Sequence, residues 1–136
     1  MNRPRFTCLR GCTNCCRRRG FIYLTEADLR RAAAFLGLTP RAFDQRYVYR
    51  TRTLLRLRKP RGSECPFLQH NGCSIHAAKP TQCRAFPFWP ELVGHPREWD
   101  QTAAYCPGIG RGRLVSIVRA LRVAGEMRQS YPGMYP

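Results

Sequence analysis

The chain has 136 residues, enough for one domain with a modest core and too few for two independent domains. It carries 24 Lys and Arg against 8 Asp and Glu, and a formal net charge of +16 attracts polyanions. No secretory signal follows Met1, and no uncharged apolar run approaches the ~20 residues that a membrane span needs, so we expect a cytoplasmic protein that makes no membrane contact.

All but two of the basic residues are arginines. Three interpretations of this excess stay open. A nucleic acid or another polyanion is a candidate partner. Part of the charge can stabilise metal-bound thiolates by lowering the pKa of the thiols. The rest can be a solvated surface, which the scattered positions of the arginines favour. The sequence identifies no partner protein.

Four of the eight cysteines lie within nine residues near the N-terminus, at Cys8, Cys12, Cys15 and Cys16. Thiols stay reduced in the cytoplasm, so eight cysteines favour a metal site over disulfides or inert buried thiols. Adjacent Cys15 and Cys16 point in different directions, which suits two parts of one metal centre better than one disulfide.

Residues 26–36 and 40–47 predict two helices. Each range follows a threonine that can serve as N-cap, Thr25 and Thr39, and the first range has an acidic first turn, where the helix dipole favours anions. Gly37 suits the position after the end of the first helix.

Residues 50–58 alternate weakly between apolar and basic side chains, which predicts a strand with one wet face. Residues 66–68 and 73–75 predict two short strands joined by an Asn-Gly turn. This hairpin would bring Cys65 and Cys73 toward the same end.

Pro80 is expected to open a helical turn that carries Cys83. Residues 86–90 interleave three aromatic rings with two prolines, and we expect an apolar lid on the core rather than a ligand-stacking surface. A short helix is expected over residues 98–105, and the glycines of residues 108–112 are expected to form a flexible connector.

Residues 112–130 place apolar side chains at helical spacing with arginines between them, which predicts an amphipathic helix packed on the core. We therefore expect a single domain over residues 1–136. It consists of a cysteine-cluster module over residues 6–111 and this C-terminal helix.

The cysteines come from segments far apart in the sequence. Zinc prefers tetrahedral Cys and His ligands, and iron–sulfur clusters prefer Cys thiolates, so both chemistries need such segments to converge. The candidate metal ligands are Cys8, Cys12, Cys15, Cys16, Cys65, Cys73, Cys83 and Cys106. They suffice for two four-coordinate ions or one cluster with spare thiols. His76 is a further candidate, as a ligand or as a donor to one.

The spacing Cys8-x3-Cys12-x2-Cys15 also occurs in radical S-adenosylmethionine enzymes. Those enzymes resemble most of a β/α barrel, which needs roughly 200 residues or more, so this chain is too short for that fold. No Ser-His-Asp set, phosphate-binding glycine loop or carboxylate pair is recognisable, and we identify no catalytic residues.

The order of these motifs resembles the YkgJ-type cysteine-cluster family of zinc- or iron-chelating proteins. The similarity spans about residues 6–111 and is carried by five motifs, at residues 8–16, 65–68, 72–76, 79–90 and 106–108. It implies that all eight cysteines chelate metal. The chain departs from the family by having three residues instead of two between Cys8 and Cys12, and His76 where many members have Tyr. Some relatives carry the module within a flagellin lysine methylase, but this chain has no recognisable methyl-donor site.

We therefore expect a small, loop-rich α+β domain, mainly helical with a short β-hairpin, organised around a cysteine metal cluster. The leading function is binding of a zinc or iron ion in a structural or metal-handling role. One alternative is an iron–sulfur protein in redox or methyl-transfer chemistry. The other is an Arg-rich nucleic-acid-binding module that uses residues 17–19 and the arginines of residues 50–58, interleaved with Tyr47 and Tyr49.

Overall fold

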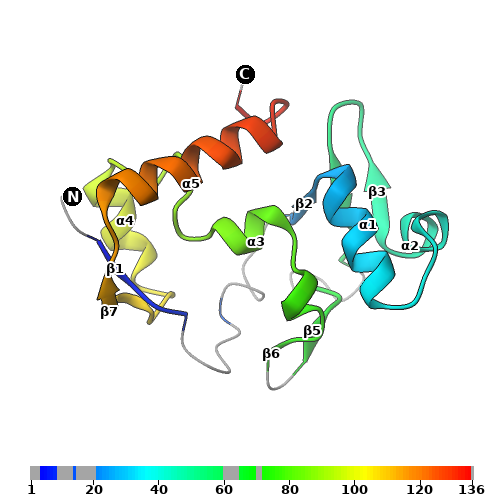
Figure 1. The fold of residues 1–136 in the computed structure, drawn as a ribbon, viewed down its shortest axis with the longest axis horizontal. Helices are drawn as coiled ribbons and strands as arrows, with labels where there is room; N and C mark the ends of the chain where they lie inside the picture. The colour runs from blue at the N-terminus through cyan, green and yellow to red at the C-terminus, as the bar shows by residue number, and fades with distance from the viewer. Residues whose placement is uncertain (1–3, 9–13, 15–20, 60–64, 70–71, 136) are drawn as a thin grey trace.

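A computed structural model of the protein describes residues 4–8, 14, 21–59, 65–69 and 72–135. Within these ranges the chain forms a small single domain of five α-helices and short antiparallel sheets, which confirms the predicted α+β class (Figure 1). None of the described helices is long and apolar enough to cross a membrane.

The described elements in chain order are β1 (Arg5–Phe6), β2 (Tyr23–Leu24), α1 (Glu26–Phe35), α2 (Pro40–Tyr47), β3 (Val48–Arg50), β4 (Leu55–Leu57), β5 (Leu68–Gln69), β6 (Gly72–Cys73), the 3-10 helix η2 (His76–Ala78), α3 (Thr81–Ala85), α4 (Pro96–Thr102), β7 (Ile109–Leu114) and α5 (Ile117–Ser130). Figure 1 shows α1, α2 and their strands on one side and α4 with the β1–β7 pair on the other. Helix α3 lies between these two groups, and α5 runs from β7 back to contact it.

Local capping determines where the first two helices begin and end. The Thr25 hydroxyl accepts a hydrogen bond from the Asp28 N–H, and the Asp28 carboxylate accepts one from the Thr25 N–H, each at 3.0 Å. The Thr39 hydroxyl accepts from the Ala42 N–H at 3.1 Å. Gly37 follows α1 with φ +70°, a conformation that glycine adopts without strain. Both helices therefore lie within one residue of their predicted bounds.

Strands β2, β4 and β3 form an antiparallel sheet with β4 in the centre. Alternation along the strands places Leu24, Val48 and Leu57 on the inner face, where none is more than 3% exposed. The strand predicted over residues 50–58 is confirmed for residues 55–57 in its C-terminal half, because Arg50 ends β3 and residues 51–54 form the loop between β3 and β4.

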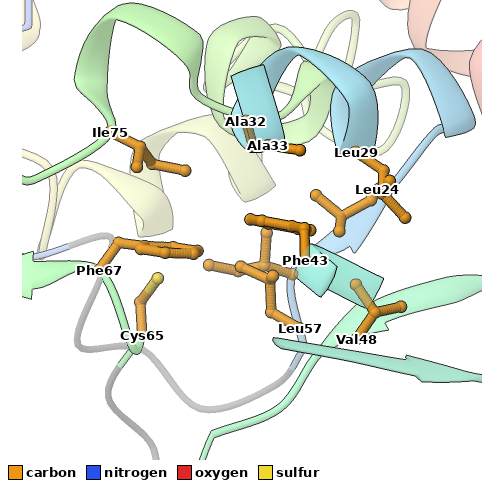
Figure 2. Close-up of a cluster of buried hydrophobic side chains, with 11 residues drawn as sticks. Leu24, Leu29, Ala32, Ala33, Phe43, Val48, Leu57, Cys65, Phe67 and Ile75 are labelled. Atoms are coloured by element: carbon orange, nitrogen blue, oxygen red, sulfur yellow. The ribbon is translucent and has the colours of Figure 1, made fainter. Parts of the chain in front are cut away.

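The largest core cluster lies between this sheet, helices α1 and α2, and the segment that carries Phe67 (Figure 2). The Phe43 ring is completely buried and stacks on Phe67 with 6.1 Å between the ring centroids. Two smaller clusters surround Tyr131 and Ala124 on the C-terminal side. Among the described residues the apolar core is thus divided into three clusters, of which the two on the C-terminal side have three buried residues each.

The glycines of residues 108–112 do not form a connector. Residues from Ile109 onward make strand β7, which pairs with β1 in an irregular, bulged register. Gly110 and Gly112 have φ values of +87° and +80°, so they bend the strand at positions where a side chain would strain it. Helix α5 accordingly begins after the strand, with Ser116 as its N-cap.

Prolines help to shape two segments, the start of α4 and residues 86–90. Pro96 occupies the first turn of α4, which starts two residues earlier than the sequence predicts. In residues 86–90 Pro87 is fully buried, and the indole N–H of Trp89 donates to the Gln82 carbonyl at 2.9 Å. This packing agrees with the apolar lid expected from the sequence.

A buried carboxylate joins elements from both sides of the domain. Asp28 is 1% exposed, and its two oxygens accept hydrogen bonds from the Thr81 N–H at 3.0 Å and the Thr81 hydroxyl at 2.8 Å. Arg31 forms an ion pair with the same carboxylate. The Tyr131 hydroxyl lies 3.3 Å from Asp28 Oδ2 and donates to the Tyr23 carbonyl at 2.8 Å. The side chains of Asp28 and Tyr131 together therefore connect α1, α3, β2 and the end of α5.

The first prediction concerns this carboxylate. The substitution Asp28→Ala leaves the Thr81 N–H and hydroxyl without their acceptor in a buried place, and we expect it to lower the free energy of unfolding by about 3 kcal/mol. Urea titration followed by circular dichroism measures the change. The matched control is Asp100→Ala, which removes the same charge from an exposed position on α4 and should change stability by less than about 0.5 kcal/mol. Equal effects of the two substitutions would contradict the structural role of Asp28.

Candidate metal centre

The structure describes five of the eight predicted metal ligands, and they differ in burial. Cys65 is buried at 6% exposure, and Cys8 is exposed. The three that are partly buried are Cys73, Cys83 and Cys106. The remaining three candidates lie outside the described residues: Cys12, Cys15 and Cys16.

Three of the described cysteines gather at the largest core cluster. Cys65 belongs to this cluster, and Cys73 and Cys83 pack against it from the partly buried shell. Figure 2 shows the Cys65 side chain pointing toward the ring of Phe67. The β5–β6 hairpin positions Cys73, because this residue pairs with Leu68 across the ladder. The hairpin and the α3 turn therefore carry cysteines that contact the largest core cluster. Convergence of their sulfurs on one metal centre stays a prediction.

Helix α3 holds Cys83 through the residues on either side of it. Thr81, at the start of the helix, is fixed by the Asp28 carboxylate. The Gln82 N–H donates to the Tyr131 hydroxyl at 3.1 Å. Burial, and then the negative charges of Asp28 and Cys83, raise the pKa of Tyr131 well above its usual value. The hydroxyl therefore stays protonated and keeps its hydrogen bonds to the chain around Cys83.

The segment that contains the N-terminal cysteines is attached beside Cys106. The Thr7 N–H donates to the Gly108 carbonyl at 3.1 Å, next to Cys8. The Asn14 side-chain amide donates to the Tyr105 carbonyl at 2.9 Å. These two hydrogen bonds reach the chain on opposite sides of Cys106. Sequence reasoning gave no role to Asn14, because a single amide between two cysteines carries no recognisable pattern.

The chain that follows the N-terminal cysteines is attached beside Cys83. The Gln82 side chain accepts a hydrogen bond from the Tyr23 N–H at 2.8 Å and donates one to the Phe21 carbonyl at 3.3 Å. Two described residues close to the N-terminal cysteines, Asn14 and Phe21, are therefore hydrogen-bonded to the chain beside Cys106 and beside Cys83. The sequence predicted that these cysteines converge, but it did not indicate which side chains attach the segment.

The described side chains do not complete a metal site by themselves. Among them, no three His, Cys, Asp or Glu residues lie close enough together to hold a metal ion. His76, the additional candidate from the sequence, is exposed at the start of η2. A site built from the described cysteines would therefore need further thiols, and the cysteines of residues 9–20 are the remaining ones in the chain.

A small α+β domain with thiols on several segments of its core is typical of metal-binding domains with cysteine ligands. The CxxCxxCC family model, described as "Putative zinc- or iron-chelating domain", matches residues 7–107, well over half of the chain. The protein therefore belongs to this family, which confirms the resemblance seen in the motif order. The family description supports binding of a metal ion, zinc or iron. No solved structure matches the chain.

The second prediction tests the attachment beside Cys106. A Cβ atom on Gly108 would lie 1.9 Å from the Thr7 carbonyl oxygen, a backbone atom that moves only if β1 moves. We expect Gly108→Ala to push the chain at Thr7 away from Gly108. It should lower the free energy of unfolding by about 1–3 kcal/mol and weaken metal binding. Denaturant titration and metal competition measure the two effects.

Gly125→Ala is the matched control for this substitution. Gly125 lies within α5, and a Cβ there would meet no atom within 4 Å. Because alanine favours the helix, this substitution should raise the free energy of unfolding by up to about 1 kcal/mol and leave metal affinity unchanged. A Gly108→Ala variant with unaltered stability and metal affinity would show that the close approach of β1 to Gly108 is dispensable.

Proposed function

We propose that the protein chelates zinc or iron through a cluster of cysteine thiolates in a structural or metal-handling role, and that its fold depends on the metal. The proposed ligands are Cys8, Cys12, Cys15, Cys16, Cys65, Cys73, Cys83 and Cys106. The observation that carries the proposal is that described residues around the N-terminal cysteines are hydrogen-bonded beside two other candidate ligands: Thr7 and Asn14 beside Cys106, and Phe21 beside Cys83.

The lengths of chain support this assignment. Cys8 directly follows Thr7, whose N–H is bonded to Gly108, and Cys16 precedes the attached Phe21 by five residues. A chain of five residues spans at most ~18 Å when fully extended, so the two attachments keep the N-terminal thiols in the neighbourhood of the others. Eight soft thiolate donors from five segments are the ligand type that zinc and iron select in reducing conditions.

A metal role in folding follows from the size of the core. The described apolar core is divided into three clusters, and domains of this size have free energies of unfolding of about 5–15 kcal/mol. A structural zinc ion supplies roughly 10 kcal/mol or more of apparent binding free energy. Metal binding on this scale would account for most of the stability of the domain.

The third prediction is that metal removal unfolds the protein. A strong chelator added under anaerobic, reducing conditions should abolish most of the helical circular dichroism and lower the melting temperature, because the thiols of separate segments lose their common ligand. Restoring the metal should restore both signals. A metal-free protein with the same helicity and melting temperature as the loaded one would contradict the proposal.

The fourth prediction tests whether Cys106 is a metal ligand. Cys106→Ser should weaken metal affinity at least tenfold, measured by competition with a chromophoric chelator, because a serine hydroxyl is a poor substitute for a thiolate. The matched control Ala104→Ser introduces the same hydroxyl at a nearby exposed position and should leave the affinity unchanged. Equal affinities of the two variants would remove Cys106 from the ligand set.

Metal and sulfide analysis of anaerobically purified protein distinguishes the leading function from its iron–sulfur alternative. A colourless protein that contains zinc and no acid-labile sulfide is expected for a structural zinc site, and a brown protein with labile sulfide for a cluster in redox or methyl-transfer chemistry. Mononuclear iron without sulfide would indicate iron handling.

A further inference from the structure

The outer face of the β2–β4–β3 sheet carries aromatic rings around an arginine. Antiparallel pairing aligns Tyr23, Arg56 and Tyr49 on one rung across the three strands. The Arg56 guanidinium lies 3.9 Å from the ring centroid of Phe21 and 4.6 Å from that of Tyr49. Two rings and one planar cation therefore form a stacked group, which we call the Arg56 stack: Phe21, Arg56 and Tyr49.

The Arg56 stack is open to solvent. Phe21 is 44% exposed and Tyr49 is 50% exposed, although both are large rings that a monomeric domain of this size would gain by burying. The neighbouring Tyr23 differs, because it packs against the C-terminal cluster around Met127 and Tyr131. Phe21 and Tyr49 are thus the rings beside Arg56 that are exposed to solvent.

The charge around the stack is positive. Arg52 in the β3–β4 loop is exposed, and so is Arg58, which follows Arg56 by two residues and therefore lies on the same side of β4. The Arg58 Nε–H donates to the Val48 carbonyl at 3.0 Å, which fixes its guanidinium near the sheet edge.

The nearby carboxylates do not cancel this charge. Arg50 forms ion pairs with both Glu26 and Asp44, so the two acidic groups are compensated within the protein. The hydrogen bonds that Arg50 donates to Glu26 and Asp44 raise the pKa of its guanidinium, which stays fully charged. The charges of Arg52, Arg56 and Arg58 are therefore a part of the net charge of +16 that is available to attract a polyanion.

We propose that the Arg56 stack and the arginines beside it bind single-stranded nucleic acid. Unpaired bases stack on aromatic rings and on guanidinium planes, and flexible arginines at the rim of such a surface contact the phosphates. Each stacked base contributes a sequence-tolerant interaction, so the expected ligand is a single strand without strong sequence preference. In a duplex the bases are stacked inside the double helix, so only its phosphates could contact this surface. The proposal is independent of the metal site's ligand set.

Fluorescence anisotropy tests the proposal, with the metal-loaded protein and fluorescein-labelled 20-mers of dT and of U titrated at several KCl concentrations. Phe21→Ala and Tyr49→Ala should each weaken binding at least fivefold, the loss expected for one stacked base. The dependence of affinity on salt should not change in these variants, because no cation is removed. Arg52→Ala should instead reduce the slope of log K against log[KCl] by about 0.7.

Two matched controls keep the test specific. Phe35→Ala removes a ring that is 51% exposed at the end of α1, and it should leave the affinity within twofold of the original. Arg97→Ala removes an exposed cation on α4 and should weaken binding less than Arg52→Ala does. Circular dichroism and thermal melting establish that each variant is folded.

Three outcomes would overturn the proposal. One is equal affinity for the single strand and for a duplex of the same length. Another is an unchanged affinity in both ring variants, which would mean that binding is general attraction to the charged surface. The third is no binding at 100 mM KCl together with adsorption to vesicles of anionic lipid, which would make the surface a membrane contact.

Discussion

The structure depends on one buried carboxylate, because Asp28 holds elements that share little apolar surface. A carboxylate taken out of water loses several kcal/mol of hydration, and it is retained where enough donors replace the lost water. Here the donors come from Thr25, Arg31 and Thr81, with the Tyr131 hydroxyl close by. The geometry is specific, because each donor can be satisfied in one relative position of its element. The network therefore fixes where α3 sits, and with it the position of Cys83.

Hydrogen bonds also hold the chain close to the proposed metal ligands, at Thr7, Asn14 and Phe21. Apolar contact alone would let the C-terminal side slide against the main core, because the clusters on the two sides are small and separate. Directional hydrogen bonds that Thr7 and Asn14 donate, and those that Gln82 accepts from Tyr23 and donates to Phe21, remove that freedom. A metal ion adds a third kind of support, since its ligands must reach a common point. Polar contacts thus set the arrangement of the segments, and the proposed metal would supply most of the energy that holds them there.

Prediction from the sequence worked where the signal was local. The caps at Thr25 and Thr39 and the turn at Gly37 depend on neighbouring residues, so the first two helices could be placed to within one residue. The burial of Asp28 could not be predicted, because an acidic residue in a first helical turn is normally exposed to water. Its acceptor role needs Thr81, 53 residues away.

The glycine-rich strand was missed for a related reason. Gly110 and Gly112 weaken strand propensity, and β7 pairs with β1, a segment far from it in the sequence. The contacts of Cys73 and Cys83 with the largest core cluster involve two local signals that the sequence does contain, a hairpin turn and a proline-opened helical turn. Convergence of the thiols on one centre stays a prediction. The hydrogen bonds of Thr7 and Asn14 to the carbonyls of Gly108 and Tyr105 could not be predicted from the sequence, since every residue has such a carbonyl.

Strand β4 contributes residues to the surroundings of both proposed sites. In β4, Leu57 points into the core cluster that contains Cys65, and Arg56 points to the outer face. A one-residue change in register would exchange these faces, so the packing that orders the inner side also orders the Arg56 stack. If the metal holds Cys65 and the chain around it, its loss loosens the inner face and with it the alignment of Phe21, Arg56 and Tyr49. Metal binding would then act on the nucleic-acid surface through the sheet, without any contact between the two sites.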